Sequence, residues 1–371
     1  MADKPPRSLL PLLTGILLVL LLLWAVIFPL QAYLSGRAKA EKVFSQALLV
    51  IEKRALKSYT PEELLPFAMG GLVIGLKDPH ADYIDAATYR RLLDFSRGMI
   101  VGIGVHVEKR GGQILISSVL PASPAEKAGL RAGDRILEVD SKDISTAPIE
   151  DISSAIHGQE GTKLRMLVLR NGKKLSVVVT RARIHMPPAT YTDYRHGIGC
   201  LRVAYFPEGV AKETAELLRG KRFGALIVDL RDNPGGDLQE GVRFADLFLS
   251  EGVILKTLSR ADGERTYRAT KAASDILCPL ALVVNSGTAS AAEFVAAALS
   301  VQRKAPIIGE KTFGKGTVIE TYPLADGSAI TITTAEYLTP DGQHIEGKGL
   351  QPTVRAFGDP LEAALSILEK K

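Results

Sequence analysis

Residues 279–320 read PLALVVNSGTASAAEFVAAALSVQRKAPIIGEKTFGKGTVIE, and this stretch predicts both the fold class and the chemistry of the chain. The apolar run Leu280–Val284 is typical of a buried strand. A loop of small residues follows it, and an Ala-rich helix is expected to begin near Ala289. Ser290 stands where strand gives way to helix, and Lys315 follows it by 315 − 290 = 25 residues. A strand, a Gly-rich turn and a helix in this order indicate an α/β protein.

Two interpretations of Ser290 follow from its position. A serine at a helix N-terminus has backbone N–H groups close by, and the helix dipole favours a developing oxyanion. Ser290 is therefore a candidate nucleophile. The candidate oxyanion donors are the amides of Ala291, Gly235 and Gly236, the glycines belonging to a second turn after a predicted strand. The alternative is structural, because Ser290-x-x-Glu293 is also a capping box.

Lys315 is the candidate base for this serine. A lysine has a reference pKa of about 10.4, so base catalysis near neutral pH requires a pKa lower by roughly 3, or about 4 kcal/mol of desolvation. The apolar neighbours Phe313, Val318 and Ile319 favour such desolvation, and the flanking glycines allow close backbone packing. The alternative is an ordinary surface lysine in a Gly turn.

The composition is that of an ordinary globular protein. The 371 residues suffice for about two or three domains with their own cores. Charged residues make up 23% and hydrophobic residues 46%, which excludes a disordered chain. The formal charge of +5 is scattered without a basic stripe, so no nucleic-acid partner is expected. Cys200 and Cys278 form no metal or CxxC pattern and are expected as small buried residues, with their pairing left open. No cofactor is expected.

The N-terminal segment is almost entirely apolar from Leu9 to Leu30. About 20 such residues span the core of a bilayer. A cleaved signal peptide has a shorter apolar region with a small-residue cleavage site close behind it, whereas the A-x-A match at Ala38–Ala40 lies well beyond this run. The sequence therefore predicts a short tail (1–8) and an uncleaved transmembrane anchor (9–32). Basic residues flank the anchor on both sides, so charge does not decide its orientation.

Residues 33–97 are expected to form an N-terminal helical region. Thr60 and Glu63 have the spacing of a capping box. Asp85 is placed to cap a second helix, and His80, alone in the segment between, is expected to be structural rather than a ligand.

Residues 98–184 change to short β-rich runs with glycine turns, and Asn171-Gly172 is a strong hairpin signal. The motifs GIGVHV (102–107) and SPAEKAGLRAGD (123–134) resemble those of a PDZ domain. There, an edge strand pairs with a peptide main chain, and N–H groups of a Gly-rich turn hold the terminal carboxylate. The alternative is a small β domain that only packs against its neighbour. The candidate substrate-binding residues are Gly102, Ile103, Gly104 and Val105.

Residues 185–371 alternate strands and helices, the pattern of an α/β layer fold. Gly-rich turns at the carboxyl ends of strands are where open α/β sheets place ligands, and Arg231–Gly236 and Ser286–Ser290 are two such turns. A final helix is expected over Pro360–Leu368. The predicted fold class is an α/β (α+β) domain, a β-rich PDZ domain, and an N-terminal helical region after a single transmembrane helix.

The chain resembles the carboxy-terminal processing peptidases, which are Ser/Lys serine proteases with an embedded PDZ domain. The resemblance extends from roughly Glu41 to Val354 and implies Ser290 as nucleophile and Lys315 as general base. It also implies an oxyanion hole from the Ala291 amide and the NPGG turn, and an anchored protease domain outside the cytoplasm, in the bacterial periplasm or cell envelope. The motifs that carry it are DPHADYID (78–85), GIGV (102–105), SPAEKAGLRAGD (123–134), LIVDLRDNPGG (226–236), VNSGTASAAE (284–293), GEKTFGKGT (309–317) and LTPDGQHIEGKGLQP (338–352).

One position departs from the family pattern. The family usually has a glutamine four residues after the lysine, where it orients the base, and Ile319 stands there in this chain. On a strand, Lys315, Thr317 and Ile319 share a face. The hypothesis is that Thr317 or a water orients the lysine, while Ile319 deepens its desolvation.

The expected function is that of a membrane-anchored serine endopeptidase that cleaves proteins at or near unstructured C-terminal tails. Its partners would be protein substrates whose C-terminus the PDZ domain binds; a homo-oligomer or an activating adaptor protein is left open. The competing function is a non-catalytic scaffold that binds tails and retains a degraded protease site. Ser290 and Lys315 argue against the scaffold, and Ile319 argues slightly for it.

Overall fold

The chain divides into two compact units, residues 1–75 and 76–371. Among the residues that the structure describes, no helix is both long enough and apolar enough to cross a membrane. The anchor predicted for 9–32 lies outside these residues. The structure, a computed structural model, describes residues 35–144, 147–271, 276–356 and 358–370.

The first unit contains a helix over residues 35–54 and helix α2 (Pro61–Ile74). The Thr60 backbone N–H donates to the Glu63 carboxylate at 2.9 Å, and the Glu63 N–H donates to Thr60 Oγ1 at 3.3 Å. Both halves of the predicted capping box are therefore confirmed.

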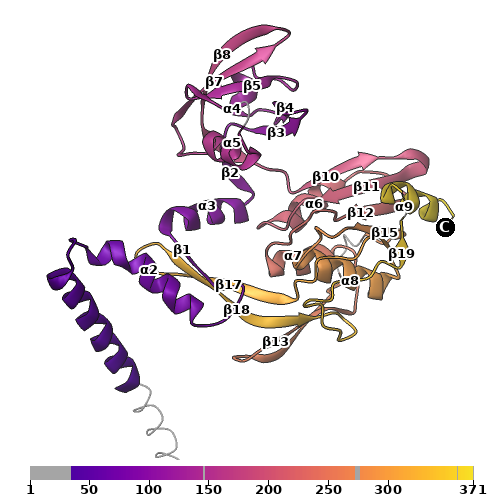
Figure 1. The fold of residues 1–371 in the computed structure, drawn as a ribbon. Coiled ribbons are helices and arrows are strands. Elements are labelled where there is room, and N and C mark those ends of the chain that lie inside the picture. Colours follow the sequence, from indigo (N-terminus) through magenta and orange to yellow (C-terminus); the bar gives the residue numbers. More distant parts are fainter. Residues whose placement is uncertain (1–34, 145–146, 272–275, 357, 371) are drawn as a thin grey trace, which may run out of the picture. The chain divides into compact units, whose positions relative to one another are not determined.

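A β-rich domain forms part of the second unit (Figure 1). Its elements are β2 (Met99–Gly102), β3 (Val105–Arg110), β4 (Gln113–Val119), α4 (Pro124–Lys127), β5 (Arg135–Val139), β6 (Lys142–Asp143), α5 (Ile149–Ile156), β7 (Lys163–Arg170), β8 (Lys173–Thr180) and β9 (Ala182–His185). The main sheet has the order β3-β4-β5-β7-β8, so β3 is an edge strand. Asn171 and Gly172 both have positive φ, 49° and 76°, as a two-residue hairpin turn requires, which confirms the predicted hairpin.

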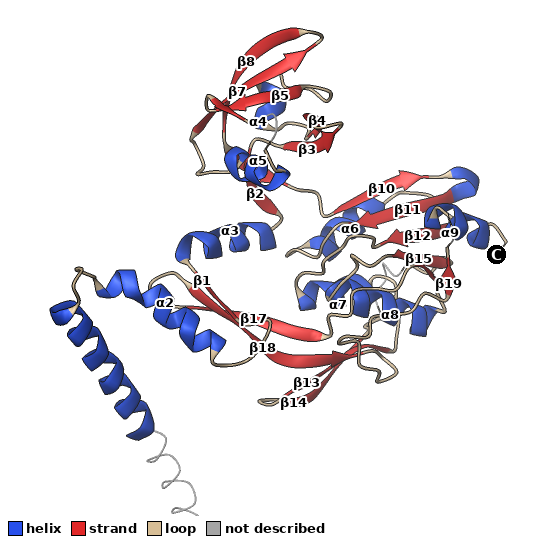
Figure 2. Ribbon diagram, viewed as in Figure 1, coloured by secondary structure: helices blue, strands red, loops and turns tan. Residues whose placement is uncertain are grey.

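A six-stranded sheet with helices on its faces follows (Figure 2). Its elements are β10 (Ala189–Asp193), a 3₁₀ turn (Arg195–Gly197), β11 (Ile198–Val203), α6 (Val210–Leu218), β12 (Ala225–Asp229), α7 (Leu238–Asp246), β15 (Leu280–Val284), α8 (Ala291–Arg303), β16 (Ile307–Gly309), β19 (Val354–Arg355) and α9 (Pro360–Leu368). The strand order is β10-β11-β12-β15-β16-β19, and all pairs after β10-β11 are parallel. This is the predicted α/β layer.

Both faces of this sheet are buried, as parallel sheets require. Along β15, Leu280, Leu282 and Val284 pack into the core with α6, α7 and α8. The alternate residues Ala281 and Val283 pack into a second core with α9. The carboxyl ends of β12 and β15 therefore lie at one edge of a rigid sheet, and the two Gly-rich turns begin there.

The second unit also contains a five-stranded sheet. It consists of β1 (Asp82–Ile84), β13 (Val253–Ser259), β14 (Gly263–Arg268), β17 (Thr317–Pro323) and β18 (Ala329–Leu338). The region 33–97, predicted as helical, thus also contains a strand, because β1 pairs with residues 329–331 of β18. Helix α3 (Ala86–Ser96) follows with Asp85 as its predicted cap.

Asp78 occupies the space beside β18 between β1 and β13. Its carboxylate accepts hydrogen bonds from the Thr333 N–H at 2.8 Å and from Thr333 Oγ1 at 3.0 Å. The Thr333 amide, followed by the His80 amide, holds the pKa of Asp78 below its ordinary value. The carboxylate thereby adds a partner beside β18 between β1 and β13, and the DPHADYID segment is part of this five-stranded sheet.

The two cysteines are free, and Cys200 is 6% exposed. Burial, followed by the nearby Asp229 charge, raises the pKa of the Cys200 thiol to about 11. At pH 8 its thiolate fraction is then about one in a thousand, compared with about a quarter for an ordinary thiol. We expect iodoacetamide to alkylate Cys200 at least about 100-fold more slowly in the folded protein than in urea, measured by peptide mass spectrometry. Equal rates would contradict this burial.

Candidate active site

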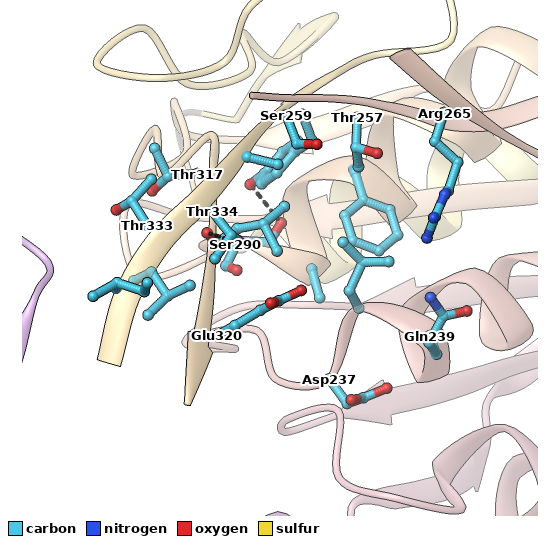
Figure 3. A pocket seen from close by; sticks show the side chains of 18 of the residues that line it. Asp237, Gln239, Thr257, Ser259, Arg265, Ser290, Thr317, Glu320, Thr333 and Thr334 are labelled. Atoms are coloured by element: carbon cyan, nitrogen blue, oxygen red, sulfur yellow. Dashed lines mark hydrogen bonds between the residues drawn. The ribbon is translucent and has the colours of Figure 1, made fainter. Parts of the chain in front are cut away.

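A cleft of about 710 Å³ lies where the two sheets meet. Ser290 and Ala291 line it from the start of α8, Lys315 from the turn before β17, and Gly236 from the turn after β12. Strands β13, β14, β17 and β18 provide its other walls, and Figure 3 shows Ser290 among the polar side chains that surround it. The fold therefore brings the predicted nucleophile and the predicted base into one cleft.

The backbone of Ser290 differs from that of an ordinary helix cap. The Glu293 carboxylate accepts the Ser290 N–H at 2.9 Å, so the capping box exists. However, Ser290 has φ 55° and ψ −121°, whereas the caps Thr60, Asp85 and Asp237 have the extended backbone of ordinary N-caps. A non-glycine residue in such a sparsely populated region is strained, and strain of this kind concentrates at functional sites. Capping alone does not require this conformation.

The predicted oxyanion donors differ in their availability. Ala291 is the first residue of α8, where the backbone N–H has no acceptor within the helix. Gly236 lines the cleft, but the Gly235 N–H donates to Asn233 Oδ1 at 2.9 Å. Gly235 instead packs directly against Ser290, since a Cβ at this position would lie 2.6 Å from Ser290 Cβ. The structure therefore favours Ala291 and Gly236 as donors and assigns Gly235 to close packing.

The backbone N–H groups around Lys315 all have partners. Those of Gly314 and Lys315 each donate to the Glu293 carboxylate at 2.8 Å. The Gly316 N–H donates to Glu346 Oε2 at 2.6 Å. Two carboxylates thus hold the donor side of a turn whose glycines would otherwise be flexible.

The carbonyl groups of the same turn have partners as well. The Gly314 carbonyl accepts from the Gly347 N–H, and the Gly316 carbonyl accepts from the Tyr337 N–H, both at 2.9 Å. The Tyr337 hydroxyl donates to the Lys315 carbonyl. Every main-chain polar group from Gly314 to Gly316 is therefore hydrogen-bonded.

Glu293 connects Ser290 to this turn. Its carboxylate is 0% exposed and accepts from the Ser290, Gly314 and Lys315 amides and from Thr312 Oγ1 at 2.5 Å. Burial raises the pKa of Glu293 above its usual range, although the Thr312 hydroxyl and the amides act in the opposite direction. The sequence indicated only a cap here, because the other donors are backbone groups that no side-chain pattern reveals.

The environment of the lysine differs in part from the one predicted. Phe313 is 65% exposed and does not desolvate the site, which is a correction to the sequence analysis. Val318 packs against the main core, and Ile319 lines the cleft. Thr317 Oγ1 is buried and has no hydrogen-bond partner in the described part of the chain, so it makes no bond to Lys315 Nζ here.

Two further groups reach the lysine turn and were missed by the sequence analysis. Tyr337 contacts it directly, and Glu346 links it to His80, whose Nε2 lies 3.8 Å from Glu346 Oε1. Glu346 stands within the motif 338–352 and His80 within the motif 78–85, whereas Tyr337 lies one residue before the first of these motifs.

The predicted peptide-binding turn precedes the edge strand β3. Gly104 has φ 82°, and a Cβ there would lie 2.4 Å from Ser123 Cβ. The Ile103 side chain is buried in the domain core, and its carbonyl accepts from the Ala125 N–H at 2.8 Å. Gly102 ends β2 and Val105 begins β3. The turn is thus fixed by the SPAEKAG motif, and among the described strands β3 pairs with β4 alone.

Comparisons with known proteins agree with this architecture. The family model "Peptidase family S41" matches residues 197–356, and the model "PDZ domain" matches residues 115–170. The chain is 32% identical over 327 residues to the carboxy-terminal processing protease CtpA of Bacillus subtilis (strain 168), covering 87% of this chain and 70% of that protein. It is 30% identical over 344 residues to a probable CtpA-like serine protease of Staphylococcus haemolyticus (strain JCSC1435), covering 90% and 69%.

A solved structure, the photosystem II D1 C-terminal processing protease, matches with a TM-score of 0.51 and 26% identity, covering 85% of this chain and 89% of that one. The PDZ match lies within the β-rich domain, and the family S41 match runs from β11 to β19 and includes Ser290 and Lys315. The chain belongs to peptidase family S41, as a serine-type carboxy-terminal processing peptidase that carries a PDZ domain.

Proposed function

We propose that this chain is a membrane-anchored serine endopeptidase that cleaves proteins at or near unstructured C-terminal tails, with Ser290 as nucleophile and Lys315 as general base. The observation that carries the proposal is the strained backbone of Ser290 in the cleft that Lys315 also lines. A degraded site would have no reason to retain this strain or the fully hydrogen-bonded turn around the lysine.

The proposed reaction proceeds through an acyl-enzyme. Neutral Lys315 Nζ takes the proton from Ser290 Oγ as the oxygen attacks the peptide carbonyl. The amides of Ala291 and Gly236 donate to the resulting oxyanion. The Lys315 ammonium then protonates the leaving amine of the substrate. The neutral Lys315 amine that results activates a water, which releases the acyl group from Ser290.

A fluorophosphonate probe tests this assignment, because it phosphonylates only an activated serine. We expect labelling at Ser290 in the wild type, identified by peptide mass spectrometry, and at least about 100-fold slower labelling in Lys315→Met. The Lys315→Met change keeps an unbranched side chain and removes the amine. Absence of labelling in the folded wild type would instead support the tail-binding scaffold, and fast labelling in Lys315→Met would refute the lysine base.

We further propose that the PDZ domain binds the substrate's terminal carboxylate at Gly102–Val105, with the tail added to the edge of β3. Amidating the C-terminus of a long tail substrate removes this charge without altering the enzyme. Since a hydrogen bond to a charged group contributes about 1.5–3 kcal/mol, KM should rise about tenfold or more, with kcat unchanged. A short peptide that contains only the cleavage site is the control, and its KM should not depend on amidation. Equal effects on both substrates would contradict tail binding.

The proposed anchor at residues 9–32 is supported by its apolar sequence. We propose that it holds the protease domain on the extracytoplasmic side, in the cell envelope. The full chain should then remain in membranes after an alkaline carbonate wash, and a form that lacks 1–34 should be released. Release of both forms would contradict the anchor.

A further inference from the structure

We propose that Tyr337 is a positioning residue for the reaction: its hydroxyl joins the main-chain carbonyls of Ser290 and Lys315 and sets their spacing. This inference rests on the proposed function, since it concerns the geometry of the proposed nucleophile and base.

The contacts of Tyr337 are unusual for a core tyrosine. The residue is 2% exposed and lies at the end of β18. Its hydroxyl donates to the Ser290 carbonyl at 3.0 Å and to the Lys315 carbonyl. A phenol has one proton, so the two carbonyls share it across residues that are far apart in the sequence. One side chain therefore determines how closely the backbones of Ser290 and Lys315 approach each other.

Tyr337 is itself held in place by its ring and its backbone. The ring packs edge-on against Phe294, with centroids 5.7 Å apart at 77°. Its backbone N–H donates to the Gly316 carbonyl, so the main chain of Tyr337 is attached to the turn that its hydroxyl contacts. The contact with Phe294 and the bond to Gly316 thus fix the position of the hydroxyl relative to α8 and to the turn.

The hydroxyl stays protonated near neutral pH. Burial raises the pKa of Tyr337 well above its ordinary value, and the nearby charges of Glu293 and Glu346 act in the same direction. Tyr337 is thus a permanent donor and cannot replace Lys315 as the base.

The backbone has a special importance in this chain. Ile319 offers no polar group to the lysine, and Thr317 Oγ1 makes no hydrogen bond in the described chain. The hydrogen bonds that hold Lys315 among the described residues are those of its main chain. Glu293 joins the N–H groups of Ser290 and Lys315, and Tyr337 joins their carbonyls, so the two residues are tied from both sides.

Tyr337→Phe tests the proposal because it keeps the ring and its packing against Phe294 and removes only the hydroxyl. We expect kcat on a short peptide to fall about 10- to 100-fold, since small misplacements of reacting groups have effects of this size. KM should stay within about twofold. The rate of fluorophosphonate labelling at Ser290 should fall by the same factor as kcat.

Tyr205→Phe is the matched control. Tyr205 is 5% exposed and donates its hydroxyl to the Met186 carbonyl at 3.0 Å, away from the cleft. Both variants lose one buried hydroxyl group, which bonds two carbonyls at Tyr337 and one at Tyr205, so each should lower Tm by about 2–4 °C. Only Tyr337→Phe should lower kcat. If Tyr337→Phe lowers Tm by more than this, kcat is calculated per active site, and the active sites are counted by the total amount of probe that binds Ser290.

The outcomes separate this inference from the proposed function. A kcat of Tyr337→Phe within twofold of wild type, or an equal loss in Tyr205→Phe, would overturn the positioning role and leave Ser290 and Lys315 in place. Cleavage that survives Ser290→Ala would overturn the proposed function itself, whatever Tyr337→Phe does. A selective loss of kcat in Tyr337→Phe, with Ser290→Ala inactive, supports both.

Discussion

Ser290→Ala is expected to lower kcat on a tail substrate by about 10⁴-fold or more and to leave the fold intact. Removal of a serine nucleophile has effects of this order, because the acyl-enzyme can no longer form. The backbone strain at φ 55° remains with alanine, so Tm should change little. The measurement is cleavage of a tail peptide, followed by mass spectrometry, together with thermal unfolding.

Ser286→Ala is the control for this variant. Ser286 lies in the same loop before α8, is exposed, and does not line the cleft. Its substitution should leave kcat within about twofold. Residual turnover by Ser290→Ala in protein free of contaminating protease would exclude Ser290 as the nucleophile.

Glu293→Gln should have the second largest effect, with a fall in kcat of about 100-fold. One carboxylate oxygen accepts from Ser290 and Lys315, and the other from Gly314 and Thr312. A glutamine replaces one of these oxygens by an NH₂ group, which then faces N–H donors in either orientation. A buried donor left without an acceptor is unfavourable by about 1–3 kcal/mol, so we expect the turn to move. A displacement of about 1 Å is sufficient for the expected loss.

Glu240→Gln is the matched control for Glu293→Gln. Glu240 is 3% exposed and accepts from the Ala211 N–H at 3.2 Å, but it does not line the cleft. Both variants neutralise a buried carboxylate, and only Glu293→Gln removes a group that joins Ser290 to Lys315. If Glu293→Gln retains kcat, or if both variants lose it equally, Glu293 has no specific role at the site.

Much of the fold could be predicted because local signals and tertiary structure agree. Leu280–Val284 is the buried strand β15, and Pro360–Leu368 is helix α9, both with the predicted bounds. The exception is β1, where Asp82–Ile84 becomes a strand only because β18 lies beside it. Such a pairing depends on residues 329–331, and no local pattern reports it.

The reacting side chains of the site could be predicted, whereas the groups that hold them in place could not. Ser290 and Lys315 could be proposed from motif and spacing, because their side chains carry the expected chemistry. The contribution of Tyr337 could not, since its hydroxyl binds backbone carbonyls that every residue possesses. The prediction for Gly235 failed for a similar reason. Its motif indicated an oxyanion donor, but its N–H donates to Asn233 Oδ1 in the folded chain. Main-chain partners follow from the fold rather than from residue types.

The row of partners along β18 has a practical consequence for shortened forms of this protein. The segment Asp78–Ile84 covers one side of this strand, through β1 and through the Asp78 carboxylate on Thr333. A form that begins at the PDZ domain, near Gly98, would leave residues 329–333 of β18 without these partners, while β13 would still pair with residues 335–338. An uncovered strand edge is a template for pairing between molecules. Aggregation of such a truncated protein would then reflect the missing segment, and solubility should return when the chain begins before Asp78.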